Sequence, residues 1–285
     1  MGLRINQNIA AQNAYRSLSV SDNQMSKSLE KLSSGFRINR ASDDAAGLAI
    51  SEGLRSQVGG LKTATRNAQD GVSVVQTAEG ALNEVHSILQ RGRDLQVQAA
   101  NGSNNQDSLD AINSELTALS EEITAIGSRT KFNGVDLLDD GTGTPGTTTT
   151  GSKLTFQVGA NSSDTLEVDM SSLDLGAAAK ALTDAAAANV GGVGSTANID
   201  LIDAEVKNIS TERGKLGASQ NRLEHTINSL NVSVENLSAS ESRIRDTDMA
   251  QEMMSFTRSQ ILSQAGTAML SQANQSQQGV LSLLR

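Results

Sequence analysis

Apolar residues recur at alternating spacings of three and four in several long segments of the chain. The clearest run lies between a segment rich in helix-capping residues, 101–108, and Gly127. Its apolar members are Leu109, Ile112, Leu116, Leu119, Ile123 and Ile126. This spacing gathers apolar side chains on one face of a helix. The pattern therefore predicts a helix that presents one apolar seam to a neighbouring helix.

Two further segments show the same spacing. One extends over residues 206–244, where Arg213 interrupts the seam in register, and the other over residues 61–89, where Glu79 and His86 lie on the seam. At a rise of about 1.5 Å per residue, the longer helix would span about 60–70 Å. None of these helices can bury its apolar stripe alone, so we expect them to pack against one another as long antiparallel helices.

The centre of the chain has a different composition. Residues 141–152 are of low complexity and contain the only proline, Pro145, which predicts an exposed loop. Apolar residues alternate with polar ones on both sides of the turn-rich segment 159–164, which predicts a β-hairpin at about 153–170. An alanine-rich stretch at 177–188 then leads back into the long helix. The centre thus has room for a hairpin and a loop.

The two ends of the chain are poor in charge. Residues 259–284 contain no charged residue, yet Ser and Gln interrupt the apolar residues so regularly that we expect no membrane span. The N-terminal segment is apolar on one side, through residues such as Leu3, Ile5 and Ile9. Neither end would be stable as an isolated helix in water, so we expect both to be disordered until they are buried against copies of the same chain.

Composition excludes several classes of protein. The chain has 285 residues and a formal charge of -9, and its basic residues are scattered, which argues against nucleic acid as a partner. The absence of cysteine excludes disulfides and thiol chemistry. The N-terminus lacks a basic region followed by a continuous apolar run, so we expect no cleaved signal peptide.

The sequence contains few residues suited to catalysis. His86 and His225 both fall inside helical repeats and do not form the His-Glu-x-x-His spacing of a zinc site. Adjacent carboxylates such as Asp43 and Asp44 point to different sides of a helix. The segment 141–146 matches a glycine-rich dinucleotide pattern but follows no βαβ strand. We therefore predict no enzymatic activity, no cofactor, and no catalytic or metal site.

Several blocks of the sequence resemble bacterial flagellin. The N-terminal blocks are LSSGFRINRASDDAAGLAISEGLRSQ at 32–57, RNAQDGVSVVQTAEGALNEVHSILQRGRDLQVQAAN at 66–101 and TKFNG at 130–134. The C-terminal blocks are SRIRDTDMAQEM at 242–253 and QILSQAGTAMLSQANQSQQGVLSLLR at 260–285, and the segment 154–170 is similar to the family's core hairpin. The resemblance covers most of the chain outside 141–152 and 171–195.

The resemblance implies a mainly α fold: long antiparallel helices forming a rod, a terminal coiled coil, and a small β-hairpin region. The terminal coiled-coil domain would comprise residues 1–44 and 246–285, and would line the inner tube of a filament. The rod would comprise 45–140 and 196–245, and a short variable region 141–195, with few or no outer domains. Apolar residues of the ends would then drive polymerisation: Leu3, Ile5, Ile9, Leu270, Val280, Leu281, Leu283 and Leu284.

The family also implies a function and a set of partners. Its members polymerise into the helical propeller of the bacterial flagellum, outside the cell, for swimming. They are exported unfolded by the flagellar type III apparatus, after a chaperone has held the C-terminal segment. Hook-associated and cap proteins adjoin the filament. The charge-free segment 259–284 is a physically sensible target for such a chaperone.

A vertebrate Toll-like receptor recognises the family through the segment that matches LQRGRDLQVQAAN. By this resemblance, Arg91, Leu95 and Glu115 would form the receptor-binding site, and Arg91 and Leu95 share one helical face. The alternative is that Arg91 and Glu115 only tie neighbouring helices together. Positions where this chain departs from the family bear on receptor fit, namely Gly92, Asp94 and Gln96.

Three alternative functions remain at this point. A hook-filament junction protein shares the terminal coiled coil but usually resembles flagellin less closely through the second helix and core. A signalling rod of the chemoreceptor type would need a membrane span or a sensory module. A flagellin with an inserted metalloprotease domain would need more central sequence and a zinc motif. The matching blocks at both ends favour the filament subunit.

Overall fold

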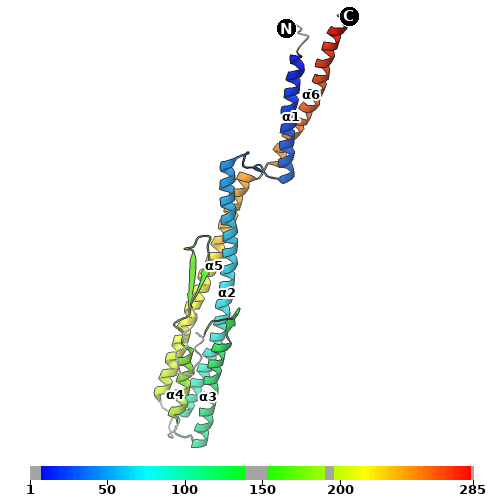
Figure 1. The fold of residues 1–285 in the computed structure, drawn as a ribbon. Coiled ribbons are helices and arrows are strands. Elements are labelled where there is room, and N and C mark those ends of the chain that lie inside the picture. Colours follow the sequence, from blue (N-terminus) through cyan, green and yellow to red (C-terminus); the bar gives the residue numbers. More distant parts are fainter. Residues whose placement is uncertain (1–7, 139–152, 190–195, 284–285) are drawn as a thin grey trace. The chain divides into compact units, whose positions relative to one another are not determined.

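The structure, a computed structural model, describes residues 8–138, 153–189 and 196–283 (Figure 1). Its helices are α1 (Ile9–Ser34), α2 (Ala45–Ala99), α3 (Gln106–Arg129), α4 (Leu175–Ala188), α5 (Thr196–Arg245) and α6 (Met249–Leu283). Its strands are β1 (Lys131–Phe132), β2 (Val135–Asp136), β3 (Lys153–Gln157) and β4 (Thr165–Asp169). The prediction of a mainly α fold with a small β region is confirmed.

The chain divides into two compact units. The terminal unit comprises Met1–Val58 and Glu235–Arg285, and the central unit comprises Gly59–Val234. Helices α2 and α5 contribute residues to both units. The domain boundaries expected from the sequence, at 44, 140, 195 and 245, stay a prediction.

The core of the central unit is built from the three predicted apolar seams. Helices α2, α3 and α5 contribute large aliphatic side chains that are almost completely buried, including Leu82, Leu89, Leu109, Leu116, Ile123 and Leu223. Two polar residues that interrupt the seams face each other, because Arg213 Nη2 of α5 lies 3.7 Å from Glu79 Oε1 of α2. The interruptions therefore form a contact between helices.

The hairpin predicted at about 153–170 is formed by β3 and β4. The strands pair antiparallel, with Lys153 opposite Asp169 and Gln157 opposite Thr165. Leu166 and Val168 of β4 enter the core. On the other strand, the Gln157 carbonyl accepts a hydrogen bond of 3.1 Å from Asn67 Nδ2 of α2. The alternation of the sequence thus reports both the strands and their buried face.

A second, shorter hairpin was not predicted. Strands β1 and β2 pair antiparallel around Asn133 and Gly134, whose φ angles are 49° and 81°. Positive φ at both central residues is typical of the type I′ turn that favours Asn-Gly. The Asn133–Gly134 dipeptide could therefore have predicted this hairpin from the sequence.

Helix α4 was not predicted as an element of its own in the centre of the chain. The alanine-rich stretch is helical, and the Asp174 side chain caps it by accepting a 2.8 Å hydrogen bond from the Ala177 N–H. Side by side with α4 lies α3 (Figure 1), whose Ser120 hydroxyl donates to the Ala179 carbonyl at 2.8 Å. A run of consecutive alanines carries no three-four spacing, so the helix was hidden from that pattern.

In the terminal unit, α1 and α6 lie side by side and antiparallel, with the N- and C-termini at the same end (Figure 1). Asn8, the N-cap of α1, donates from Nδ2 to the Ala273 carbonyl at 3.1 Å. Further along the pair, the Ser263 hydroxyl donates to Asp22 Oδ1 at 2.8 Å. The two ends of the chain therefore form one helix pair.

Candidate functional site

The most deeply buried side chains in the contact between α1 and α6 are small. Ser21 and Ser28 of α1 and Ser259 of α6 are buried, and Leu18 lies against Gly266. Serine, glycine and alanine let two helices approach closely, but they bury little apolar area. The seam of the terminal helix pair is thus well formed and weakly hydrophobic.

Large apolar side chains of the same two helices point away from the seam. We call this set the outward face, and its members are Ile9, Tyr15, Val20, Leu29, Met249, Met253, Met254, Ile261, Leu262 and Met269. Each is at least 48% exposed in this unit. Soluble monomers rarely leave so many large apolar residues uncovered along one pair of elements. This face therefore needs a partner.

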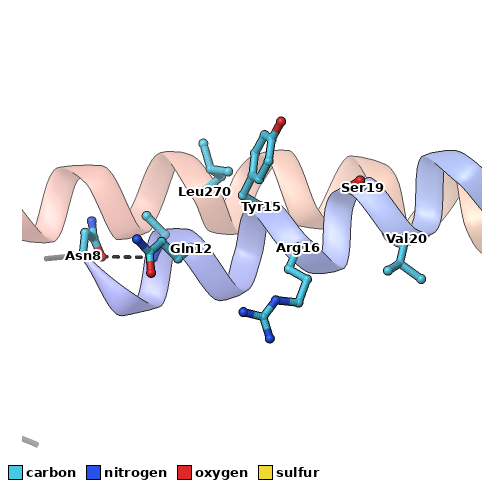
Figure 2. A pocket seen from close by; sticks show the side chains of 8 residues that line it. Asn8, Gln12, Tyr15, Arg16, Ser19, Val20 and Leu270 are labelled. Carbon is cyan, nitrogen blue, oxygen red and sulfur yellow. Dashed lines mark hydrogen bonds between the residues drawn. The ribbon is translucent and has the colours of Figure 1, made fainter.

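A groove crosses the terminal helix pair at its outer end. It is lined by Asn8, Ala11, Gln12, Tyr15, Arg16, Ser19, Val20 and Leu270. Figure 2 shows Tyr15 of α1 and Leu270 of α6 on the same side of the pair, with the Arg16 side chain on the opposite side. An aromatic ring beside a leucine makes one side of this groove apolar.

The structure places two of the predicted polymerisation residues on this pair. Ile9 is 53% exposed on the outward face, and Leu270 lines the groove. The remaining six lie outside the residues whose side chains the structure describes, namely Leu3, Ile5, Val280, Leu281, Leu283 and Leu284. Sequence reasoning missed the methionines and the Ile261–Leu262 pair, because apolar residues lie all around α6 and no single stripe stands out.

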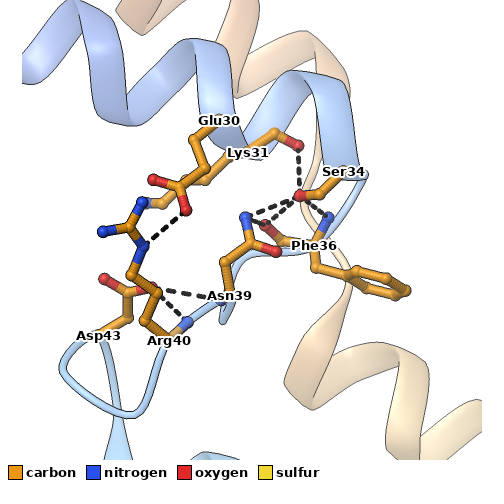
Figure 3. A network of polar contacts seen from close by, with 7 residues as sticks. All are labelled: Glu30, Lys31, Ser34, Phe36, Asn39, Arg40 and Asp43. Carbon is orange, nitrogen blue, oxygen red and sulfur yellow. Dashed lines mark hydrogen bonds and ion pairs between the residues drawn. The ribbon is translucent and has the colours of Figure 1, made fainter.

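A polar network holds the segment that follows α1 (Figure 3). Asn39 donates from Nδ2 to the Ser34 hydroxyl at 2.7 Å, and Arg40 Nε pairs with Glu30 Oε1 at 2.8 Å. Asp43 Oδ2 accepts from the backbone N–H groups of Asn39 and Arg40, at 3.2 and 3.0 Å. The Arg40 N–H, chief among these contacts, lowers the pKa of Asp43. The network fixes how the chain leaves α1.

In the central unit, the structure places the three predicted receptor residues unequally. Arg91 of α2 pairs with Glu115 of α3 at 2.7 Å, and both side chains are about half exposed. Leu95 is 2% exposed and belongs to the core. The ion pair therefore lies at the surface, whereas the leucine supports it from below.

Near Arg91, three residues differ from the family pattern, and the packing of helix α4 explains two of them. A methyl group at position 92 would overlap the Leu182 side chain of α4, so Gly92 provides the space that this leucine fills. Gln96 is buried and exchanges two hydrogen bonds of 3.1 Å with the Asn189 side chain just after α4. Asp94 is exposed, and no contact explains it.

Comparison with known proteins identifies the family. The family model described as "Bacterial flagellin N-terminal helical region" matches residues 5–142, and the one described as "Bacterial flagellin C-terminal helical region" matches residues 199–284. A flagellin of Halalkalibacterium halodurans is 53% identical over 281 residues, covering 99% of each chain. The chain belongs to the bacterial flagellin family.

Two further flagellins are similar to this chain. A flagellin of Bacillus subtilis is 49% identical over an alignment of 307 residues, which covers 99% of this chain and 100% of that one. The crystal structure of Bacillus cereus flagellin is 31% identical, with a TM-score of 0.47, and covers 58% of this chain and 88% of that chain.

Within its described residues, the flagellin has no group of three or more His, Asp or Glu side chains placed to hold a metal ion. His86 contacts Gln90 on its own helix, with 2.9 Å between the two Nε2 atoms. Over the same residues, no helix combines the length and apolar character needed to cross a membrane.

Proposed function

We propose that this flagellin is a filament subunit that joins copies of itself through the outward face of α1 and α6, forming the extracellular propeller for swimming. The observation that carries the proposal is that this helix pair buries small side chains and exposes large apolar ones, the reverse of an ordinary helix contact. The residues buried in the seam are small, and the large apolar residues of the outward face are exposed. The role is structural rather than enzymatic.

The energetics favour assembly through this face. Burying one large apolar side chain contributes about 1.5–3 kcal/mol relative to leaving it exposed. The outward face holds side chains such as Met254, Ile261 and Met269, each at least 60% exposed. The 259–284 segment adds no charge whose desolvation would oppose burial. Contact with further subunits would therefore stabilise these helices more than their own seam does.

The same face accounts for the other proposed partners. An apolar helix must be covered before assembly, so we propose that an export chaperone holds the C-terminal segment before secretion. Hook-associated and cap proteins would cover the outward face at the two ends of the filament. Each partner would contact apolar side chains that the free chain leaves exposed, such as Ile261 and Leu262.

Recognition by a Toll-like receptor is a second proposed function, favoured by the exposed Arg91–Glu115 pair. The receptor would contact these two charged groups, and the buried Leu95 would hold α2 in place beneath them. Arg91→Ala should weaken binding to a purified receptor ectodomain at least tenfold, whereas Arg66→Ala, elsewhere on α2, should leave it unchanged. Equal binding by both variants would remove the receptor role.

The assembly proposal is tested by seeded polymerisation of the purified chain under salting-out conditions, which strengthen apolar burial. Met254→Ser and Ile261→Ser each remove a large outward side chain, and Gln260→Ser is the matched control because it removes an exposed polar one. If each apolar loss costs about 1.5–3 kcal/mol, the critical concentration rises about 10- to 100-fold. Elongation is followed by electron microscopy. Equal elongation of all three variants would overturn the proposal.

A further inference from the structure

In the terminal unit, the segment that follows α1 lies next to the segment that connects α5 to α6. Helix α1 ends at Ser34, α5 ends at Arg245, and α6 begins at Met249. Gly35 closes α1 with a φ of 76°, and its N–H donates to the Lys31 carbonyl at 2.8 Å. Beyond these ends, Phe36 and Asp246 form an antiparallel bridge between two segments far apart in the sequence.

Three hydrogen bonds join these segments. The Arg37 N–H donates to the Arg245 carbonyl at 2.7 Å, and the Thr247 N–H donates to the Gly35 carbonyl at 3.0 Å. The Arg37 guanidinium adds a bond of 2.6 Å from Nη2 to the Ile244 carbonyl, which is free at the end of α5. These hydrogen bonds to backbone groups therefore fix residues 35–37 against residues 244–247 in one register.

Two side chains cover this bridge. The Arg245 guanidinium carbon lies 4.7 Å from the centre of the Phe36 ring, and Arg245 Nη1 pairs with Glu52 Oε1 of α2 at 2.7 Å. Figure 3 shows the Phe36 ring pointing away from the polar network that holds the rest of its own segment. The Arg245 side chain is only 17% exposed. A planar cation between a ring and a carboxylate suits arginine better than lysine.

The small residues in the seam between α1 and α6 do not by themselves specify one alignment. Three of the α6 residues on the side that meets α1 repeat at intervals of seven, as Ser259, Gly266 and Ala273, and all three are small. Leu18 packs on Gly266, but after a slip of seven residues it would meet another small residue. These three positions therefore discriminate poorly between registers. A slip would also break the hydrogen bond between Ser263 and Asp22, which contributes only about 0.5–1.5 kcal/mol.

We infer that the junction of residues 35–37 with 245–247, which we call the clasp, sets the register in which α1 pairs with α6. This role rests on the proposed assembly through these helices. The clasp joins the end of α1 to the start of α6. Pairing of the two helices therefore begins next to the clasp, where only a short loop has to be closed, and extends from there toward the chain termini. Arg245 is then a positioning residue for the terminal helices, and Phe36 and Glu52 hold it.

The register can be measured by disulfide trapping, because the chain contains no cysteine of its own. A Cβ atom built on Gly266 lies 3.5 Å from Leu18 Cβ, within the range of a disulfide. Leu18→Cys with Gly266→Cys therefore reports the native register. Leu18→Cys with Ser259→Cys, or with Ala273→Cys, reports a slip of seven residues in either direction. Each pair is oxidised in the soluble chain and in seeded filaments.

Phe36→Ala combined with Arg245→Ala removes the two side chains that cover the bridge and exposes its backbone hydrogen bonds to water; we call this variant the opened clasp. The matched control is Arg55→Ala, which removes a different arginine beside Glu52, 3.8 Å away, without touching the bridge. Arg245→Lys keeps the charge but not the plane, so it should restore the native register only in part. Thermal unfolding of the central unit checks that each variant still folds.

With the clasp intact, and with Arg55→Ala, only the Leu18–Gly266 pair should close rapidly. With the clasp opened, closure of that pair should fall severalfold and the slipped pairs should appear. If the opened variant still closes only the Leu18–Gly266 pair, the seam sets the register and the inference is wrong. If the intact chain forms no filaments, the proposed function fails, and closure of all three pairs in the soluble chain would independently overturn the clasp.

Discussion

The side chains buried between helices include many leucines and isoleucines in the central unit, whereas between α1 and α6 the buried side chains are those of Ser21, Ser28 and Ser259. Leu82, Leu89 and Leu116 are completely buried among neighbouring helices of one chain. Met254, Ile261 and Met269 of α6 are large as well, yet they face outward. The difference teaches that the central unit carries its own hydrophobic stabilisation, while the terminal pair reserves its apolar area for other molecules.

Removing residues 260–285 should have the largest effect on this comparison. It takes most of α6 from the terminal unit and leaves the central unit's sequence intact. Seeded elongation should be lost entirely, because α1 loses its partner and the outward face loses Ile261, Leu262 and Met269. The thermal unfolding of the central unit, followed by circular dichroism, should persist. Normal filaments from the truncated chain would show that assembly does not use α6.

Alanine at one seam leucine of each unit should separate the two regions by stability. Leu116→Ala opens a cavity in the central core and should lower the free energy of unfolding by about 2–5 kcal/mol. Leu18→Ala should cost less than about 1 kcal/mol, because its site in the terminal pair is only partly buried. Urea unfolding measures both. Equal costs would mean that the terminal pair is a self-sufficient core.

Two glycines of α2 test how α4 fits the central unit. Gly92→Ala gains about 1 kcal/mol of helix propensity but loses about 1–3 kcal/mol through overlap with Leu182, so it should destabilise. Gly80→Ala, where nothing lies within 4 Å, should stabilise by up to about 1 kcal/mol. In a Leu182→Ala background the sign at position 92 should reverse. A stabilising Gly92→Ala in the unmodified chain would contradict this packing.

Acid should weaken the polar network of the terminal unit, and this is the smallest of the expected effects. The Arg40 N–H lowers the pKa of Asp43 below its ordinary value of 3.8. The bond therefore favours the folded network above that pH, and its contribution is lost as pH falls below 3.8 through the folded value. The Arg40 amide resonance should shift in that window, and Asp43→Asn should abolish the shift. An unchanged amide resonance in the unmodified chain would remove Asp43 from the network.

Sequence by itself determined the three long helices of the central unit and the hairpin of β3 and β4. The three-four spacing identified the seam of α3, and the alternation from Leu154 to Met170 identified β3 and β4, because each pattern has the period of one type of element. The flagellin family was likewise readable from the blocks at both ends. Of the candidate site, the charge-free C-terminal segment and Ile9 were visible without a structure.

Tertiary structure alone decided which faces of the terminal helices meet. Apolar residues surround α6, so its periodicity could not choose between Gly266 in the seam and Ile261 outside it. Helix α4 also became visible only in the fold, where Leu182 fills the space above Gly92. A sequence pattern records which side chains are apolar, but the choice among apolar faces depends on shape, and shape exists only once the partner helix is in place.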